Sequence, residues 1–293
     1  MLFKLTNEQR MIRAMAREFA RKEVAPTAAE RDRTKAYPSE NLAKLGDLGF
    51  LGMMVPTEYD GEGADTVSYA LALAEIAAAC ASTAVIMSVH NSIVCHSILR
   101  FGSKAQKETY LRPLARGEFI GAFALTEPHA GSDPVSQDTT AVRQGDHYIL
   151  NGTKRFITSG RYSGLVIVTA KTDPDARHKG ISAFIVPKQT PGLVVGREED
   201  KMGLRASDTT DLLFEDCRVP AANLLGAQGQ GFKIAMTALD GGRIGIAAQS
   251  LGVAQAAFEA AVKYVKKRSQ FGQKVSKFQG IRWMVADMAT QIE

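Results

Sequence analysis

The spacing of hydrophobic residues divides the chain into three zones. Up to about residue 121, apolar side chains recur at helical spacing, as Ile12 and Phe19 do on one face of the first run. From about residue 122 to residue 225, short runs rich in β-branched and aromatic residues alternate with turn residues. From about residue 231, helical spacing returns and persists to the end of the sequence. The pattern therefore predicts helices, then strands, then helices.

The N-terminal zone carries two signals for the start of a helix. Thr6 stands three residues before Gln9, and Ser103 stands three before Gln106, which is the spacing of a capping box. Pro26 is predicted to end the first helix, because a proline inside a helix lacks the N–H donor and clashes with the preceding turn. Further helices are predicted over residues 39–49, 66–80 and 82–101.

The middle zone is predicted to form a small antiparallel barrel or sandwich, because it contains several short strands separated by turns. The pairs Gly145-Asp146 and Asn151-Gly152 are turn signals, and the second pair is typical of a tight β-hairpin. The predicted strands span residues 148–150, 153–158, 165–170, 181–186 and 212–219.

The C-terminal zone is predicted to hold two helices, the second of which begins after Gly272. That helix is still running at Glu293, where its last carbonyl groups would lack partners, so we expect the natural chain to continue. The predicted fold class is α+β. It comprises an N-terminal helical domain (residues 1–121), a middle antiparallel β-barrel domain (residues 122–228) and an incomplete C-terminal helical bundle domain (residues 229–293).

The composition is that of a globular protein, with 45% hydrophobic and 23% charged residues. The net charge of +5 is dispersed, so the basic residues indicate a solvated helix face and no nucleic-acid partner. The apolar stretch over residues 76–89 is too short and too mixed for a membrane span, so no membrane partner is expected. The three cysteines form no CxxC pair, which favours a reducing cytoplasm or organelle matrix.

Several common sites are excluded by their missing motifs. The chain has no GxxxxGK[ST] loop, no GxGxxG after a strand, no HExxH and no GxSxG elbow. His90 and His96 lie six residues apart, which is poor spacing for one helix face, so structural roles are favoured and no metal site is predicted.

Four other segments combine small, hydroxyl and charged residues in ways that could serve a ligand. Taken one at a time, they could also be an interdomain loop, a hairpin strand, a tightly packed helix and a helix–turn–helix with an ordinary terminal arginine. Two adjacent glycines inside a helix cost roughly 2 kcal/mol relative to alanine, so close packing or ligand approach is expected there. The segments are FALTEPHAGSD (residues 123–133), NGTKRFIT (residues 151–158), DGGR (residues 240–243) and RSQFG (residues 268–272), followed by Gln279.

In this order and spacing, the four segments closely resemble the acyl-CoA dehydrogenase family, especially its short-chain members. The resemblance covers the whole chain and includes DCRVPAANLL (residues 216–225) after the last predicted strand. It implies an FAD bound between the middle β domain and the helical domains. The implied reaction is α,β-dehydrogenation of a short- to medium-chain acyl-CoA thioester in fatty acid β-oxidation, with electrons passed to electron-transfer flavoprotein.

The resemblance also implies which residues form the site. Ser132 is expected to contact both FAD and substrate. Arg268, Phe271 and Gln279 are expected to reach the FAD of a neighbouring subunit. That arrangement implies a homotetramer, a dimer of dimers. The implied FAD contacts are Phe123, Leu125, Thr126, Ser132, Phe156, Ile157, Thr158, Arg268, Phe271 and Gln279, and the implied substrate contacts are Ser132, Asp240, Gly241, Gly242 and Arg243.

Two positions depart from the family pattern, and a third bears on the catalytic base. Phe156 stands where many relatives have Trp, and His129 stands where Gly is common. The family's catalytic Glu lies either at the position of Gly242 or in a later segment, so no catalytic residue is assigned and the base is expected beyond residue 293. As given, the chain is therefore expected to bind FAD weakly or not at all and to lack dehydrogenase activity.

Two alternatives remain open at this point. One is an enzyme of the same fold with different flavin chemistry, such as an acyl-CoA oxidase or a flavin monooxygenase. The other is a non-catalytic, truncated member of the family that binds or assembles without turning over substrate.

Overall fold

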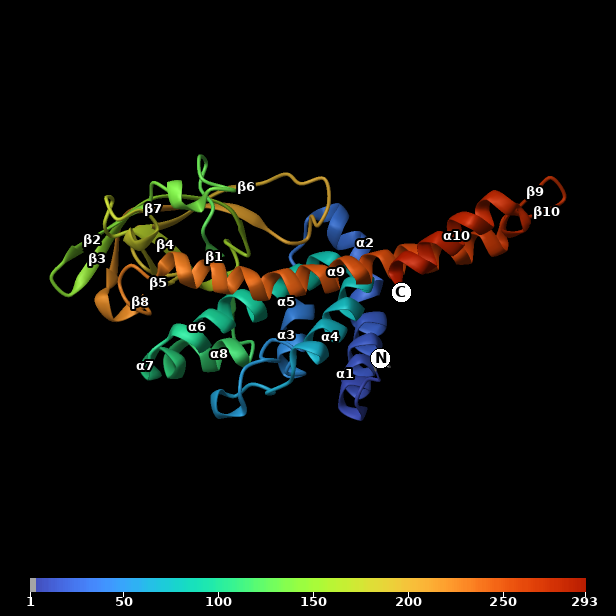
Figure 1. Cartoon of the computed structure of the whole chain (residues 1–293), viewed down its shortest axis with the longest axis horizontal. Coiled ribbons are helices and arrows are strands. Elements are labelled where there is room, and N and C mark those ends of the chain that lie inside the picture. Colours follow the sequence, from blue (N-terminus) through green and yellow to red (C-terminus); the bar gives the residue numbers. More distant parts are fainter. Residues whose placement is uncertain (1–3) are drawn as a thin grey trace.

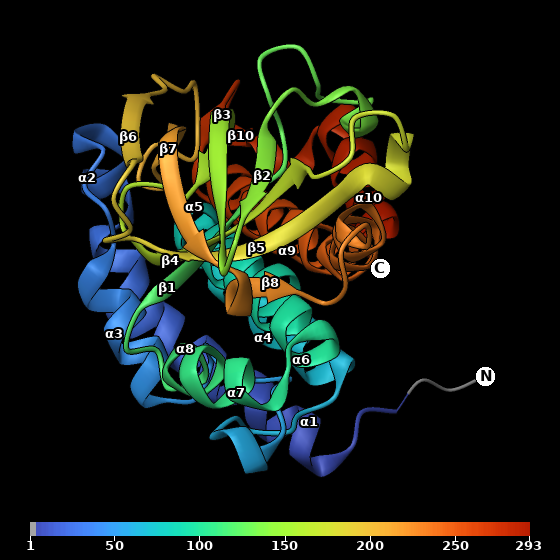
Figure 2. The same cartoon turned by 90° about the vertical axis from the view of Figure 1, so that its left-hand side faces the viewer.

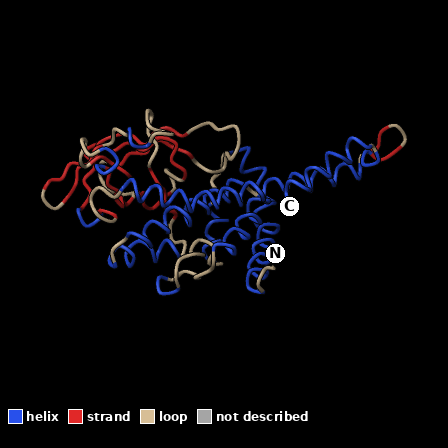
Figure 3. Tube along the Cα trace, in the orientation of Figure 1, coloured by secondary structure: helices blue, strands red, loops and turns tan. Residues whose placement is uncertain are grey.

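The computed structural model of the chain describes residues 4–293. Helices occupy both ends of the sequence and strands lie between them (Figure 3), as the hydrophobic pattern predicts. The sheet lies at one end of the molecule, and the long helix α9 passes along it and extends to the other end (Figure 1). The N-terminal helices lie on one side of the sheet (Figure 2).

The N-terminal region begins with capped helices. Thr6 and Gln9 form the expected capping box, in which each side chain bonds to the backbone N–H of the other residue. Ser103 and Gln106 form the second box in the same way. The elements of this region are α1 (Asn7–Phe19), η1 (Ala20–Val24), α2 (Ala25–Thr34), α3 (Ser39–Asp47), η2 (Thr57–Tyr59), α4 (Thr66–Ala79), α5 (Ala81–Ser88), η3 (Val89–Cys95), α6 (His96–Phe101), α7 (Lys104–Gln106), η4 (Lys107–Leu111) and α8 (Arg112–Ala115).

The prediction that Pro26 ends the first helix is wrong. The chain continues through η1, a π-helical turn, and α2 carries Pro26 in its first turn before ending at Thr34. A proline is tolerated in the first turn of a helix, because its missing N–H would have no helical partner there. The wider turn at η1, where the Ala25 N–H bonds to the Ala20 carbonyl, starts a new hydrogen-bond register before the proline.

The helices from α4 to α6 form the centre of the helical core. Tyr69, Leu73 and Ile76 of α4 are fully buried and pack with α1 and α3 residues. The stretch Ala81–Phe101 is apolar and long enough, by length and composition alone, to cross a membrane. It is mostly buried inside the protein, as the core helix of a globular domain is.

The middle region forms one eight-stranded sheet in the order β6-β7-β3-β2-β4-β5-β8, with β1 paired to β4. Most pairs are antiparallel, while β1 and β2 pair with β4 in parallel. Among the described strands, the end strands β6 and β8 each pair on one side, so the sheet is open where a closed barrel was expected. The strands are β1 (Ile120–Ala124), β2 (Thr140–Gln144), β3 (His147–Thr158), β4 (Ser163–Lys171), β5 (Ile181–Pro187), β6 (Leu193–Glu198), β7 (Thr209–Pro220) and β8 (Leu224–Leu225), with short 3-10 turns η5 (Pro134–Ser136), η6 (Arg177–Gly180) and η7 (Ala221–Asn223).

The hairpin expected at Asn151-Gly152 does not exist. The strand β3 runs straight through this pair, and the tight turn lies instead at Gly145-Asp146, where β2 meets β3. Gly152 stands at a bulge against β7, where a Cβ would clash with Thr139. The Asn151 side chain bonds to Asp216 across the bulge, so the pair serves a kink within the strand rather than a turn.

The C-terminal region consists of α9 (Gly231–Lys267) and α10 (Gln279–Ile292), with η8 (Val275–Lys277) before α10. Between these helices a two-stranded hairpin, β9 (Ser269–Gln270) and β10 (Gln273–Lys274), replaces a simple helix–turn–helix connection. The turn residues Phe271 and Gly272 both have positive φ, as a tight two-residue hairpin requires. The hairpin projects at the end of the molecule opposite the sheet (Figure 1).

Candidate active site

The first and second motif segments meet where β1 ends beside β3. The N–H of Arg155 donates a 2.7 Å hydrogen bond to the carbonyl oxygen of Thr126. Because β1 also pairs with β4, the end of this strand is held from both sides. The structure thus brings residues 123–126 and 155–158 together, as expected for two segments that would serve one ligand.

Phe156 has a backbone conformation that is unusual for its residue type. Its φ is +59°, in the left-handed region that disfavours residues with a Cβ, and it sits at a bulge between Lys154 and Ile157. Its side chain is 54% exposed, with the Arg155 guanidinium 5.1 Å from the ring centroid. Strain and an exposed aromatic ring at one position are features of a binding surface, and such a ring suits stacking on a flat cofactor.

The neighbours of Phe156 face in different directions. Ile157 is 2% exposed and packs in the core of the sheet, so it can offer only its backbone to a ligand. Thr158, Leu125 and Thr126 are partly exposed, and Phe123 packs against the helices beneath the sheet. The surface around Phe156 therefore combines an aromatic ring, hydroxyl groups and backbone edges, a donor set that fits a flavin ring.

A fully buried lysine lies directly beneath this surface. The Nζ of Lys154 donates to the carbonyl oxygen of Leu125 (3.0 Å), to Glu127 Oε1 (2.7 Å), to Gln137 Oε1 (2.8 Å) and to Thr169 Oγ1 (3.3 Å). Desolvation lowers the pKa of Lys154 to about 8, against the attraction of the Glu127 carboxylate. Although burial alone would raise it, the pKa of Glu127 is lowered by the charge of Lys154 and by hydrogen bonds from Lys154, Thr139 and Asp138.

The loop from β1 to β2 is folded around Glu127. The Glu127 carboxylate accepts the backbone N–H groups of Asp138 and Thr139, and the backbone of Glu127 pairs with that of Ala130. These bonds close the loop at both ends and leave Ser132 exposed on its outer side. Ser132 is therefore accessible to a ligand.

The third motif segment lies on α9 against the π-helical segment η3. A Cβ added to Gly241 would lie 3.1 Å from the carbonyl oxygen of Ser92, and one added to Gly242 would lie 3.2 Å from Cδ1 of Ile93. The adjacent glycines therefore let two helices approach closely. Asp240 and Arg243 point outward and are exposed. Because η3 also contacts β1, it connects this segment to the first motif.

The fourth motif segment is remote from the other three. About 36 Å of helix separates Arg243 from Lys267 on α9, given a rise of roughly 1.5 Å per residue. Phe271 is 91% exposed at the hairpin tip, and Arg268 and Gln279 are exposed nearby. Within one chain, the structure does not bring these residues to the surface formed by the first two segments.

Two features of this region, the role of Lys154 and the π-helical segment η3, were not identified from the sequence, whereas the structural role expected for His90 agrees with its backbone hydrogen bonds. By its sequence alone Lys154 is an ordinary strand residue, because its hydrogen-bond partners lie far away in the sequence. The π-helical segment η3 carries His90, whose Nδ1 accepts the Gly121 N–H (3.2 Å) while its Nε2 bonds to the Leu114 carbonyl oxygen (3.0 Å). Complete burial lowers the pKa of His90 to about 4, so a neutral ring fixes the start of β1.

No metal centre accompanies this surface. Among residues 4–293, no group of three or more His, Cys, Asp or Glu side chains could hold a metal ion. Cys80, Cys95 and Cys217 are free and buried.

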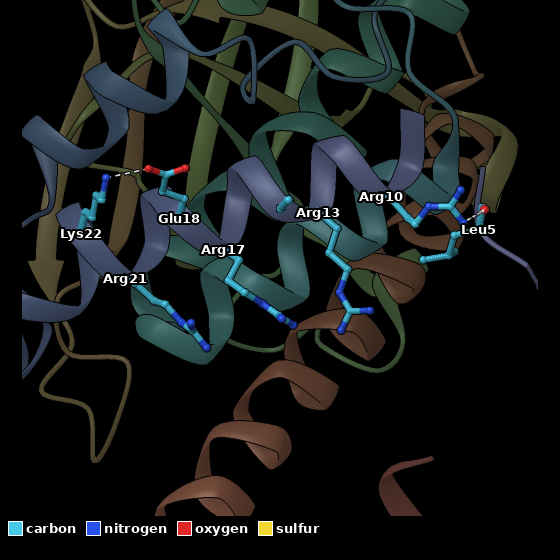
Figure 4. A pocket seen from close by; sticks show the side chains of 8 residues that line it. Leu5, Arg10, Arg13, Arg17, Glu18, Arg21 and Lys22 are labelled. Carbon is cyan, nitrogen blue, oxygen red and sulfur yellow. Dashed lines mark hydrogen bonds and ion pairs between the residues drawn. The ribbon is translucent and has the colours of Figure 1, made fainter. Parts of the chain in front are cut away.

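Two grooves lie away from the motif segments. One, of about 570 Å³, follows the basic face of α1 and η1, to which Arg10, Arg13, Arg17 and Arg21 contribute (Figure 4). The other, of about 700 Å³, lies between α1, α4, α9 and the end of α10. Arg13 and Arg17 both pair with Glu75, so part of this basic face is neutralised by the neighbouring helix.

Comparison with known proteins identifies the family. Residues 6–118 match the acyl-CoA dehydrogenase N-terminal domain, residues 122–217 the middle domain and residues 229–293 the C-terminal domain. The chain is 50% identical over 291 residues to the short-chain specific acyl-CoA dehydrogenase of Clostridium acetobutylicum, covering 99% of this chain and 77% of that protein. The chain belongs to the acyl-CoA dehydrogenase family.

Solved structures of related proteins agree with this assignment. Butyryl-CoA dehydrogenase from Megasphaera elsdenii superposes with a TM-score of 0.97 at 46% identity, over 100% of this chain and 77% of that one. A chain from the structure of the electron transferring flavoprotein of Acidaminococcus fermentans superposes with a TM-score of 0.98 at 51% identity, over 100% of this chain and 77% of that one. The predicted family and its helix–sheet–helix fold are therefore confirmed. As a family member, the chain is a flavin-dependent oxidoreductase with FAD as its cofactor.

Proposed function

We propose that the protein to which this chain belongs carries out the FAD-dependent α,β-dehydrogenation of a short-chain acyl-CoA thioester, with the base for the α-proton supplied from outside residues 1–293. The observation that carries the proposal is the junction of the two segments expected to enclose the flavin, which are joined by the Arg155–Thr126 backbone hydrogen bond. Electron-transfer flavoprotein is the partner that would accept the electrons. Similarity to the Clostridium short-chain enzyme and to the chain from the Acidaminococcus flavoprotein structure supports this substrate and this partner.

The FAD contacts divide between the two joined segments. Phe156 would stack on the flavin, and Thr126 and Thr158 would donate hydroxyl hydrogen bonds to it, together with contacts from Phe123 and Leu125. FAD supplies the acceptor for the β-hydrogen, which leaves as hydride. The protein's own contribution is to hold donors where negative charge develops during the reaction. Ile157 would take part through its backbone, because its side chain is buried in the core.

The substrate-binding side of the site would be formed by α9 and by the loop between β1 and β2, called the outer loop below. Ser132 is exposed on the loop between β1 and β2, while Asp240 and Arg243 are exposed on α9 and would meet the polar and anionic parts of CoA. Gly241 and Gly242 would contribute the close helix approach that shapes this wall. Gly242 has no side chain and is packed against Ile93, so this position of α9 supplies no base for the α-proton.

Arg268, Phe271 and Gln279 are proposed to serve the FAD of a second copy of the chain. Their place beyond the end of α9, about 36 Å of helix past Arg243, supports this, because a flavin held by the first two segments is out of their reach within the same chain. The exposed aromatic ring of Phe271 at a hairpin tip suits insertion into a neighbouring subunit. The proposed assembly is a homotetramer, a dimer of dimers.

Domain boundaries after residues 121 and 228 are proposed to separate the three folding regions. A cytoplasmic location, or an organelle matrix in a eukaryote, is proposed as well. The bacterial short-chain relative and the three free, buried cysteines favour such a reducing compartment.

The visible spectrum of the purified protein tests the proposed function. A flavin absorbance band that bleaches on addition of butyryl-CoA, with reduction of an artificial electron acceptor, would support the dehydrogenase. Oxygen consumption at a comparable rate would favour an oxidase of the same fold. A band that shifts with the thioester but does not bleach would indicate binding without removal of the α-proton. Absence of any flavin band after incubation with FAD would contradict the proposal.

A further inference from the structure

We propose that Lys154, paired with Glu127, is a positioning residue that fixes the geometry of the flavin and thioester surfaces from beneath. Lys154 would not touch the cofactor or the substrate, because its side chain is fully buried. This inference rests on the proposed function, since it assigns the surface above Lys154 to those ligands.

The four acceptors of Lys154 come from both ends of the loop between β1 and β2 and from β4. Leu125 belongs to the first flavin segment, Glu127 to the start of the outer loop, Gln137 to the end of that loop and Thr169 to the central strand β4. Lys154 itself precedes Arg155 and Phe156 in the second flavin segment. One ammonium group thus sets the position of both flavin segments and of the loop that carries Ser132.

Glu127 connects Lys154 to the two ends of the outer loop. Its carboxylate, 5% exposed, accepts the Lys154 ammonium and the backbone N–H groups of Asp138 and Thr139. The next bond along the chain runs from Lys171 N–H to the Thr139 carbonyl oxygen at 2.8 Å, which ties the loop end to β4. If the carboxylate moved, both ends of the loop would lose their anchor.

Stability alone does not account for an ion pair at this place. Removing two charges from water costs free energy that their attraction often fails to repay, so apolar residues of similar volume can be equally stable. The pair instead determines the positions of its partners, because an ammonium group holds each of its several acceptors at hydrogen-bond distance. The strained, exposed Phe156 two residues away needs such support to keep its conformation.

A set of variants separates positioning from general stability. Lys154→Met keeps an unbranched side chain one atom shorter than lysine, removes every side-chain donor and leaves the Glu127 carboxylate without its cationic partner. The double variant with Glu127→Gln also removes that unpaired charge, so its melting temperature should recover much of what Lys154→Met loses. Val219→Ala is the matched control. Val219 lies on β7 beside the end of β3 that is remote from Lys154, and its truncation creates a small cavity in the same sheet core.

The first measurement is amide hydrogen exchange without added FAD. In Lys154→Met and in the double variant, the amides of Asp138, Thr139 and Arg155 should exchange at least about tenfold faster than in the wild type, a change of roughly 1.4 kcal/mol in local opening. Val219→Ala should leave these amides close to the wild type once global stability is matched. Unchanged exchange at these amides in both Lys154 variants would overturn the inference.

The second measurement is FAD affinity, followed by the change in flavin fluorescence, together with the shape of the visible flavin band. If Lys154 positions the surface, the double variant should bind FAD about tenfold more weakly and with an altered band, even though its melting temperature has recovered. If affinity and band recover together with the melting temperature, the pair has only a structural role and the inference is wrong. Failure of the wild type itself to bind FAD would count against the proposed function, whereas the exchange data report on the loop alone.

Discussion

At the scale of single residues, the surface around Phe156 is built from groups that pay a local free-energy cost. Phe156 holds a left-handed backbone, and Lys154 and Glu127 are buried charges. Asp208 is also buried, and its carbonyl oxygen accepts the N–H of Ser159, three residues after Phe156. Such groups persist where the surrounding structure holds them in place, and they tend to cluster at functional sites. Each of them gives a measurable prediction.

At position 156, a glycine should leave the protein more stable than an alanine does, which is the reverse of their usual order in a strand. Both Phe156→Ala and Phe156→Gly remove the ring, but only glycine adopts φ near +59° without strain. We therefore expect Phe156→Gly to be more stable than Phe156→Ala by about 1 kcal/mol. Urea unfolding of both variants measures this difference, and both should lose FAD affinity relative to the wild type. An alanine variant that is as stable as the glycine variant would show that the backbone is not strained.

Asp208 should make stability fall as the pH rises through the acidic range. Burial raises the pKa of Asp208 to about 6, although its carboxylate accepts the Arg161 N–H at 2.8 Å. A carboxyl with a raised folded-state pKa stabilises the fold fully below its unfolded pKa near 4 and loses that contribution by about pH 6, which amounts to about 3 kcal/mol. Asp208→Asn should remove this component from the change in unfolding free energy between about pH 4 and about pH 7. A variant with the pH dependence of the wild type would assign the titration to another group.

The candidate site illustrates which residues a sequence can and cannot reveal. Phe156 and Thr126 could be proposed as site residues, because they sit in short motifs whose order resembles that of the family. The role of Lys154 could not, because its partners Glu127 and Thr169 become neighbours only when β1, β3 and β4 align. Contacts made across a sheet depend on register, which local patterns do not specify.

At the scale of elements, local capping chemistry was predictable and tertiary context was not. The two capping boxes formed as expected, since each depends on residues three positions apart. Asn151-Gly152 failed as a hairpin because pairing of β3 with both β2 and β7 favours a continuous strand with a bulge. Pro26 failed as a helix end because a π-helical turn resets the hydrogen bonds before it.

The glycines of α9 should behave differently from a glycine of α10. A Cβ at Gly252 would clash with the carbonyl oxygen of Ala74 on α4, so Gly252→Ala should destabilise the protein by roughly 1–3 kcal/mol despite the higher helix propensity of alanine. Gly280→Ala is the matched control, because nothing lies within 4 Å of its Cβ position, and it should stabilise by up to about 1 kcal/mol. Thermal unfolding of both variants checks the prediction. Stabilisation by Gly252→Ala would mean that α4 and α9 separate easily.

At the scale of the whole molecule, the N-terminal helices and the sheet are joined by contacts that no local pattern indicates. Tyr37 stacks on Tyr162 with ring centroids 4.1 Å apart, and the Arg205 N–H bonds to Asp32 Oδ1 at 2.9 Å. The first contact attaches the segment after α2 to the turn that follows Thr158, and the second attaches α2 itself to the loop between β6 and β7. The surface around Phe156 is thereby held by both parts of the molecule. At the other end, the hairpin of β9 and β10 stands apart from them (Figure 1).

The hairpin tip provides the test of the proposed assembly. If Phe271 inserts beside the FAD of a second copy, Phe271→Ser should lower the mass of the protein in solution and weaken FAD binding together, since one contact serves both. Met11→Ser is the matched control, because Met11 is 71% exposed on α1 and its loss removes a similar amount of exposed apolar surface. Sedimentation over a range of protein concentrations, with and without FAD, measures both effects. A Phe271→Ser protein with the mass and FAD affinity of the wild type would place Phe271 outside the subunit interface, and the three distant residues would then need another role.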